Sequence, residues 1–190
     1  MAVILDDIIG GFYTYFIMLL ILGIYNLNYF YYSFFLLLPA MIANMTPVLL
    51  KMKYLNTPIN ENLFGKNKTW RGFIGAIIIG SLSYFLLVKL NFVNSANSFY
   101  LIVLVGFLFS LGAIGGDLIE SFLKRKMNIK AGESWVPFDQ IDYILGMIIL
   151  TFYFYHYSFN QIIFLLILGG AISALAHRLG YVFKINKAKQ

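Results

Sequence analysis

The acidic residues best placed to do chemistry lie inside an apolar stretch of this 190-residue chain. In a helix predicted over residues 99–123, Asp117, Glu120 and Ser121 fall at positions i, i+3 and i+4, and Lys124, just after it, falls at i+7 on the same face. A carboxylate costs roughly 3 kcal/mol at the bilayer centre, so carboxylates in such segments usually mark a functional site. A packing motif with an interfacial Glu–Lys pair is the alternative, but it leaves Asp117 without a basic partner four residues on.

A second acidic pair, Asp139 and Asp142, follows Pro137 at the start of another apolar segment. Taken alone, Asp139 is a natural helix cap and Asp142 a favourable first-turn residue. Together with Asp117 and Glu120, however, the pair can complete a cluster of four carboxylates. Oxygen ligands without His or Cys suit Mg²⁺, which proteins hold with a few carboxylates plus substrate phosphates. Because a cation also offsets the repulsion between the carboxylates, we predict a Mg²⁺ site.

A basic loop over residues 65–72 precedes another apolar segment. Its glycines leave backbone amides accessible, and Lys66, Lys68 and Arg71 can clamp a polyphosphate. The glycine spacing is not that of a Walker loop. The loop could instead be ordinary cytoplasmic charge with Trp70 as an interface anchor. Beside an acidic metal site on the same side of the membrane, phosphate binding is the preferred interpretation.

The composition shows what kind of protein carries these patches. Hydrophobic residues make up 61% of the chain, aromatic residues 18% and charged residues 12%, and the mean hydropathy is +0.80. Soluble domains carry roughly 25% charged residues, so this is an integral membrane protein. We expect a single domain over residues 1–190. The absence of cysteine excludes disulfides and thiolate metal sites. The net charge of +6 comes from loops and therefore indicates topology rather than nucleic-acid binding.

The apolar segments predict an all-α, polytopic membrane helix bundle of about six, at least five, transmembrane helices. The candidate spans are residues 8–25, 29–50, 73–90, 99–122, 141–157 and 160–183. The first of these is short. The second contains Pro39, Asn44 and Pro47, which predict a kinked or broken helix.

Loop charge predicts the orientation of the bundle. Nine of the fourteen basic residues lie in loops 51–72 and 123–140. By the positive-inside rule, both loops face the cytoplasm and together form the active site of a multi-pass cell-membrane protein. His177 and Arg178 lie near the same end and could reach a phosphate, but the sequence assigns them no role.

Three ordered segments resemble the CDP-archaeol synthase family and, more distantly, phosphatidate cytidylyltransferase. They are residues 68–72, residues 116–125 and residues 137–142. The resemblance extends from Leu38 to the last predicted span. It departs from the family pattern before Gly65, where residues 56–62 lack the expected Gly- and Arg-rich run.

The resemblance implies transfer of CMP from CTP to the phosphate of a lipid glycerol phosphate, such as the bis-geranylgeranyl ether. The products are CDP-archaeol and pyrophosphate, within phospholipid biosynthesis. It also implies that Asp117, Asp139 and Asp142 hold Mg²⁺ and, with Lys68, are the catalytic residues. The CTP or lipid phosphates would be held by a wider set: Lys66, Lys68, Thr69, Arg71, Glu120, Ser121, Lys124 and Arg125.

Other functions remain open at this point. Within the enzyme class, the alternative is an ester-lipid enzyme that makes CDP-diacylglycerol. A transporter would use Asp117 and Glu120 as an ion site, but the sequence lacks the internal repeat typical of transporters. A non-catalytic lipid-binding subunit would need no carboxylate cluster. The expected partners are CTP and a lipid substrate in the bilayer, with no nucleic acid, and the sequence does not fix an oligomeric state.

Overall fold

The computed structural model describes residues 27–50, 54–94, 98–130, 133 and 135–182. The predicted span 8–25 lies outside the described residues. Within them the chain is helical, apart from loops and one isolated antiparallel bridge between Pro58 and Thr69. The helices are α2 (Leu27–Leu49), α3 (Glu61–Phe64), α4 (Trp70–Lys89), α5 (Phe99–Lys126), α6 (Phe138–Tyr155) and α7 (Phe159–Val182). The prediction of an all-α membrane bundle is confirmed.

Four segments of these helices are long and apolar enough to cross a membrane: Tyr31–Leu49, Trp70–Lys89, Phe99–Lys126 and Phe159–Ala176. Helix α6 covers most of the predicted fifth span, but it is 18 residues long and has Asp139 in its first turn. Of the predicted kinked or broken helix around Pro39, the break does not occur, because α2 is continuous over 23 residues with Pro39 and Pro47 inside it. Membrane helices tolerate proline where neighbouring helices enclose the freed backbone, and Ala40 and Ala43 here are fully buried.

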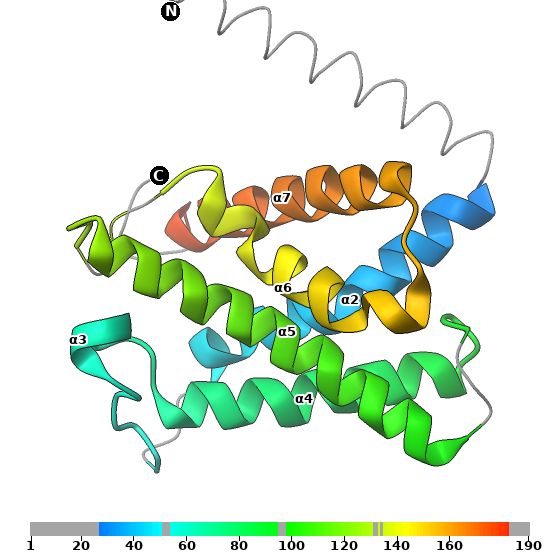
Figure 1. The fold of residues 1–190 in the computed structure, drawn as a ribbon, viewed down its shortest axis with the longest axis horizontal. Coiled ribbons are helices and arrows are strands. Elements are labelled where there is room, and N and C mark those ends of the chain that lie inside the picture. The colour runs from blue at the N-terminus through cyan, green and yellow to red at the C-terminus, as the bar shows by residue number, and fades with distance from the viewer. Residues whose placement is uncertain (1–26, 51–53, 95–97, 131–132, 134, 183–190) are drawn as a thin grey trace, which may run out of the picture.

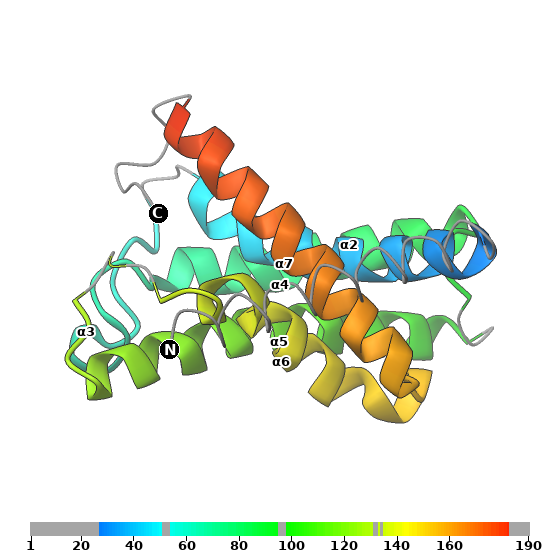
Figure 2. The ribbon, with the colours of Figure 1, turned by 90° about the horizontal axis from the view of Figure 1, so that it is seen from above.

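Helix α5 is the centre of the bundle, with α4 packed on one side and α6 on the other. Helix α2 packs against α4, α5 and α6, and α7 contacts α6 and α2 (Figure 2). The largest fully buried side chains include Tyr84, Phe109 and Tyr143. Tyr84 stacks on Phe109 with ring centroids 5.1 Å apart, and its hydroxyl lies 2.6 Å from that of Tyr155. These contacts join α4, α5 and α6 into one core.

Three glycines form a close seam between α5 and α6. A Cβ atom at Gly112 would lie 2.8 Å from the backbone of Met147, and one at Gly146 would lie 2.9 Å from the amide nitrogen of Gly116. Only glycine permits so close an approach of two helix backbones. The seam brings the end of α5 that carries Asp117 against the start of α6, which carries Asp142.

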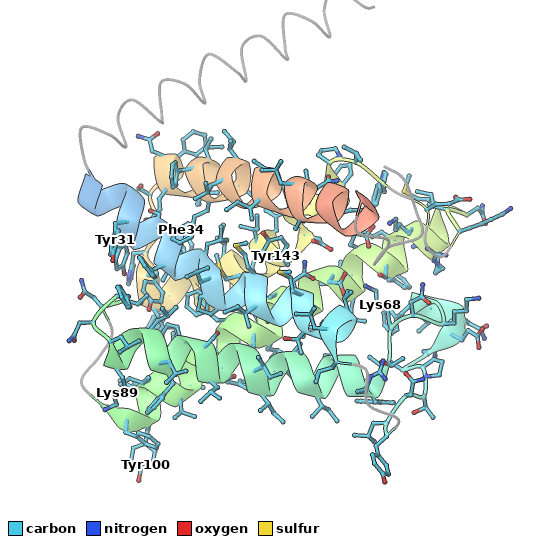
Figure 3. All side chains as sticks on the ribbon, turned by 180° about the vertical axis from the view of Figure 1, so that it is seen from behind. Tyr31, Phe34, Lys68, Lys89, Tyr100 and Tyr143 are labelled. Atoms are coloured by element: carbon cyan, nitrogen blue, oxygen red, sulfur yellow. The ribbon has the colours of Figure 1, made fainter. Side chains whose placement is uncertain are left out.

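The two ends of the bundle differ in charge. Figure 3 shows Lys68 at one end and Lys89 and Tyr100 at the other. Between them the outer faces are apolar, with Ile78 and Ile149 60% and 70% exposed. Exposed apolar side chains between two polar ends are what a bilayer requires.

Candidate active site

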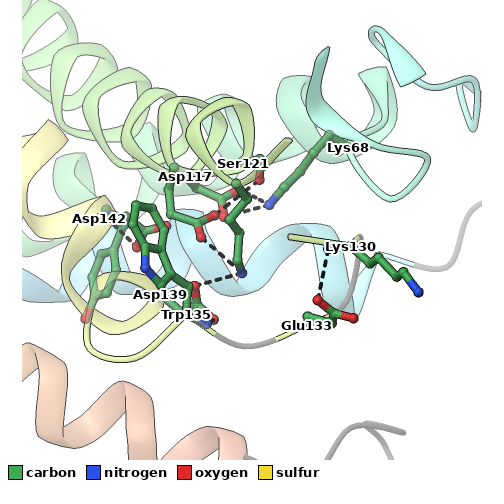
Figure 4. Close-up of polar contacts among 11 residues, drawn as sticks. Lys68, Asp117, Ser121, Lys130, Glu133, Trp135, Asp139 and Asp142 are labelled. Atoms are coloured by element: carbon green, nitrogen blue, oxygen red, sulfur yellow. Dashed lines mark hydrogen bonds and ion pairs between the residues drawn. The ribbon is translucent and has the colours of Figure 1, made fainter. Parts of the chain in front are cut away.

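Three carboxylates from two helices converge at the end of the bundle that carries Lys68. Asp117 and Glu120 come from α5 and Asp142 from α6, and one oxygen of each lies within 4.8 Å of the others. Glu120 and Asp142 are buried, with 7% and 8% of their surface exposed, and Asp117 is partly buried. Figure 4 shows Asp117 and Asp142 pointing into the space between the two helices. Carboxylates gathered in so little space repel one another unless cations neutralise them.

Lys68 supplies the first cation. Its Nζ lies 2.6 Å from both carboxylate oxygens of Asp117 and donates hydrogen bonds to them (Figure 4). Burial by itself would lower the pKa of Lys68, but the charge and hydrogen bonds of Asp117 outweigh that effect and raise it. The lysine therefore places a positive charge at the edge of the acidic cluster.

Lys124 supplies the second cation and lies between Glu120 and Asp139. Its Nζ is 3.0 Å from Glu120 Oε1 and 2.8 Å from Asp139 Oδ1. The backbone N–H of Trp135 donates to the other oxygen of Asp139 over 2.8 Å. Asp139 is thus not the helix cap that its sequence position first suggested, because Pro137 occupies that position. In this arrangement Glu120, rather than Asp139, completes the carboxylate triplet with Asp117 and Asp142.

The charge balance of these groups fits a divalent cation. Four carboxylates (Asp117, Glu120, Asp139 and Asp142) and two ammonium groups (Lys68 and Lys124) leave two negative charges when all are ionised. The metal ligands that the described residues offer here are carboxylate oxygens, which favour a hard ion such as Mg²⁺ over a transition metal. The residues therefore fit the predicted cofactor. The role of Asp139 as a metal ligand remains a prediction.

Backbone pairing fixes the loop that delivers Lys68. The N–H of Ile59 donates to the carbonyl of Lys68 over 2.8 Å, beside the Pro58–Thr69 bridge. Gly65 has φ +85°, which glycine adopts at little cost and which turns the chain after α3. The side chain of Thr69 then caps α4 by accepting from the N–H of Gly72. Together these contacts hold Lys68 at the mouth of the acidic cluster.

The other predicted site residues occupy different surroundings. Lys66 is exposed, and Arg71 is partly buried in the first turn of α4. The Ser121 hydroxyl lies 3.4 Å from Glu120 Oε2, to which it donates. Arg125 has a buried Nε without a hydrogen-bond partner among the described residues. Thr69 is used as a helix cap, and the side chains of His177 and Arg178 lie outside the described residues.

Sequence reasoning missed the Lys68–Asp117 ion pair. The two residues are 49 positions apart, and the search for a partner of Asp117 considered only its own helix. The available signal was a basic loop entering one apolar helix and a lone aspartate near the end of another.

Comparison with known proteins decides the family. The family model for CarS-like CDP-archaeol synthase matches residues 24–189. The chain belongs to the CDP-archaeol synthase family. The CDP-archaeol synthase of Pyrococcus abyssi is 34% identical over 166 residues, covering 83% of this chain and 96% of that protein. The enzyme of Thermococcus kodakarensis is also 34% identical, over 80% of this chain and 93% of its own length.

A solved structure supports the same assignment. It is described as an intramembrane enzyme for archaeal membrane lipids biosynthesis, and it matches with a TM-score of 0.62 and 26% identity. The match covers 78% of this chain and 91% of the other. This member of the CDP-archaeol synthase family is therefore a membrane-embedded cytidylyltransferase of lipid biosynthesis, and the resemblance noted from the sequence is confirmed.

We expect Lys68→Ala to raise the KM for CTP at least tenfold. A hydrogen bond to a charged group contributes about 1.5–3 kcal/mol, and each 1.4 kcal/mol is a factor of about ten. Arg71→Ala should act in the same direction, and Arg71→Lys should restore only part of the loss because lysine cannot grip two phosphate oxygens. The measurement is the CTP dependence of initial rates in detergent. Lys130→Ala is the control, since Lys130 is an exposed cation of the second polar loop. Unchanged kinetics in both alanine variants would reduce the basic loop to a topology signal.

Proposed function

We propose that this membrane enzyme transfers CMP from CTP to the phosphate of a lipid glycerol phosphate, yielding the CDP-lipid and pyrophosphate. The observation that carries the proposal is the triplet of Asp117, Glu120 and Asp142 with Lys68 at its edge. A cluster of carboxylates beside a fixed ammonium group suits a triphosphate with its cation. The favoured acceptor is the bis-geranylgeranyl ether of glycerol phosphate, in keeping with the names of the relatives.

The chemistry needs charge neutralisation more than acid–base catalysis. A phosphate oxygen of the lipid attacks the α-phosphorus of CTP, and the bond from that phosphorus to the bridging oxygen of pyrophosphate breaks. The nucleophile is already an anion, so no side chain has to remove a proton from it. Two anions must nevertheless approach each other, and positive charges must offset their repulsion.

The residues divide this work. Asp117, Asp142 and Glu120 would hold Mg²⁺, which when bound supplies Lewis-acid stabilisation of the phosphate oxygens. Lys68 lies close enough to that position to contact the same phosphates. Arg125 brings a buried Nε without a partner among the described residues, and it lies next to Lys124 at the end of α5. Asp139 holds Lys124 through their ion pair and, as the sequence predicts, would also contribute a carboxylate oxygen to the ion.

The reaction can be tested directly. Purified protein is given CTP labelled in the cytidine, Mg²⁺, and either the bis-geranylgeranyl ether or a diacyl ester of glycerol phosphate. We expect label in the lipid fraction, stoichiometric pyrophosphate and a preference for the ether. A preference for the diacyl ester would assign the protein to CDP-diacylglycerol synthesis instead. Ion flux in vesicles without any lipid labelling would contradict an enzyme of either kind.

We also propose that the site faces the cytoplasm. Lys89 lies at the end of the bundle opposite to Lys68. Seven of the described basic residues lie at the site end: Lys66, Lys68, Arg71, Lys124, Arg125, Lys126 and Lys130. The positive-inside rule places that end in the cytoplasm, where CTP is available.

Cysteine labelling tests this topology in the naturally cysteine-free chain. We expect Asn60→Cys and Asn128→Cys to resist a membrane-impermeant maleimide in sealed cells. Asn94→Cys, at the opposite end, should react with it. Strong labelling at position 60 or 128 before lysis would show that the site faces outward.

A further inference from the structure

A second feature of the site end is an apolar groove between α6 and α7. Its volume is about 580 Å³, which is within the range of small-molecule binding sites. Pro137, Gln140 and Ile141 line one side, and α7 lines the other with Ile163, Gly170 and Ala174 among its residues. Gln140 is the polar member of an otherwise apolar lining. A groove of this composition suits a hydrocarbon, not a nucleotide.

The groove begins at the same helical turn that carries the site carboxylates. Asp139 and Asp142 face α5, where Asp139 pairs with Lys124 and the carboxylate of Asp142 lies beside those of Asp117 and Glu120. Gln140 and Ile141 lie between them in the sequence and face α7, where a Cβ atom added at Gly170 would lie 3.3 Å from the Ile141 side chain and 4.0 Å from that of Gln140. The first turns of α6 therefore contribute to both places: Asp139 and Asp142 to the acidic cluster, and Gln140 and Ile141 to the groove. A molecule with a polar head and an apolar chain can therefore occupy both.

The length of the groove matches one leaflet of a membrane. From Ile163 to Ala174 the α7 wall rises by about 16 Å at 1.5 Å per residue. The hydrocarbon core of a bilayer is about 30 Å thick, so this wall is about as long as one leaflet is deep. Gly170 and Ala174 are small, so the α7 side of the groove leaves space for a ligand beside the start of α6.

A second apolar groove offers a comparison. It has a volume of about 450 Å³ between α4 and α5 and is lined by residues including Phe85, Phe99 and Val103. Phe99 begins α5 at the end of the bundle opposite to Lys68. A lipid chain in that groove would leave its phosphate on the wrong side of the membrane from the carboxylates.

We propose that the α6–α7 groove holds one hydrocarbon chain of the lipid acceptor while its phosphate passes the N-terminal end of α6 to the carboxylate cluster. This inference rests on the proposed function and adds the location of the acceptor. It makes Gly170, Ala171 and Ala174 residues that determine how bulky a chain the enzyme accepts.

Blocking each groove separately tests the inference. We expect Ala174→Trp to lower kcat/KM for bis-geranylgeranyl glycerol phosphate at least tenfold, with the KM for CTP unchanged. Activity on a dihexyl analogue, whose chains barely enter the groove, should stay within twofold of the parent. Val103→Trp places the same bulk in the α4–α5 groove and should leave the activity on both acceptors unchanged.

Other outcomes separate the failures. If Ala174→Trp leaves long-chain activity intact, the acceptor chain lies elsewhere. If both acceptors lose activity equally in monodisperse protein, another part of the bundle or a second copy fills the groove, and the inference is overturned. If the parent uses neither acceptor, the proposed function itself fails.

A measurement on the unmodified protein does not depend on how the variants fold. An acceptor with a photoactivatable diazirine in its chain should label peptides from α6 and α7 in preference to those from α4 and α5. Label confined to α4 and α5 would place the chain in the other groove and overturn the proposal.

Discussion

Asp117→Asn and Asp142→Asn are each expected to lower CMP transfer by about a hundredfold to a thousandfold, the usual loss when a single transition-state charge contact is removed. Asparagine keeps the size of aspartate but not its charge, so the residual activity reports on electrostatics rather than packing. Both carboxylates belong to the triplet with Glu120, and an amide is a poor ligand for Mg²⁺. Activity of the parent should require Mg²⁺ and should disappear on chelation.

Asp139→Asn distinguishes two roles for that residue. A metal ligand would lose activity as severely as Asp117→Asn, the result we predict. A residue that only anchors Lys124 and the N–H of Trp135 would lose much less, since the amide oxygen of asparagine can still accept one of these two hydrogen bonds.

Glu133→Gln is the control for these three variants. It removes an exposed carboxylate at the same end of the molecule, whose oxygen accepts from the backbone N–H of Lys130 (Figure 4). Its activity should match that of the parent. If Asp117→Asn, in verified monodisperse protein, also kept the activity of the parent, the metal-dependent mechanism would be wrong.

Gly116→Ala is expected to lower the rate by about a hundredfold, the cost of misplacing reactive groups by about 1 Å. The new Cβ atom would collide with the backbone carbonyl of Asp142, whose carbon lies 2.9 Å from that position. Two helix backbones must then separate, and the Asp142 carboxylate moves with α6. Overpacking of this kind also costs about 1–3 kcal/mol of stability.

The neighbouring glycine provides a matched control. A Cβ atom at Gly115 would meet nothing within 4 Å, so Gly115→Ala should keep both activity and thermal stability. The informative readout is the concentration of Mg²⁺ that gives half-maximal rate. A displaced carboxylate should raise this concentration in Gly116→Ala, whereas a merely less stable protein should retain the parent value at a temperature where it is folded. Equal behaviour of the two variants would show that the seam does not position the site.

Much of the fold can be predicted from the sequence because membrane-spanning helices are long, apolar segments that are easily recognised. The spans predicted at 73–90 and 99–122 correspond to α4 and α5, although both helices extend further into the polar residues. Helix α4 begins at Trp70 because Thr69 caps it, a local signal readable in advance. Pro39 and Pro47 do not interrupt α2, because neighbouring helices enclose it, which the rules for an isolated helix ignore.

The site was harder to predict in detail than the fold. Spacing alone placed Asp117, Glu120 and Lys124 on one face, and the ion pair between the last two confirms that geometry. Spacing could not show that Lys124 also holds Asp139, or that Lys68 reaches Asp117, because those contacts depend on how separate segments pack. The carboxylates of Asp139 and Asp142 are separated by the rotation of α6, which turns one toward Lys124 and the other toward Asp117.

The partly buried Lys68 and the buried Lys124 have a consequence for how the protein tolerates loss of its cation. Many small metalloproteins unfold without metal because their ligands have no other partner. Here Asp117 and Glu120 already have internal counterions in Lys68 and Lys124, at 2.6 and 3.0 Å. These ion pairs neutralise part of the carboxylate charge without the metal ion. The bundle should therefore stay folded when the ion is absent. Inactivation by a chelator can then be reversed by restoring the ion, and it reports on the chemistry rather than on collapse of the membrane helices.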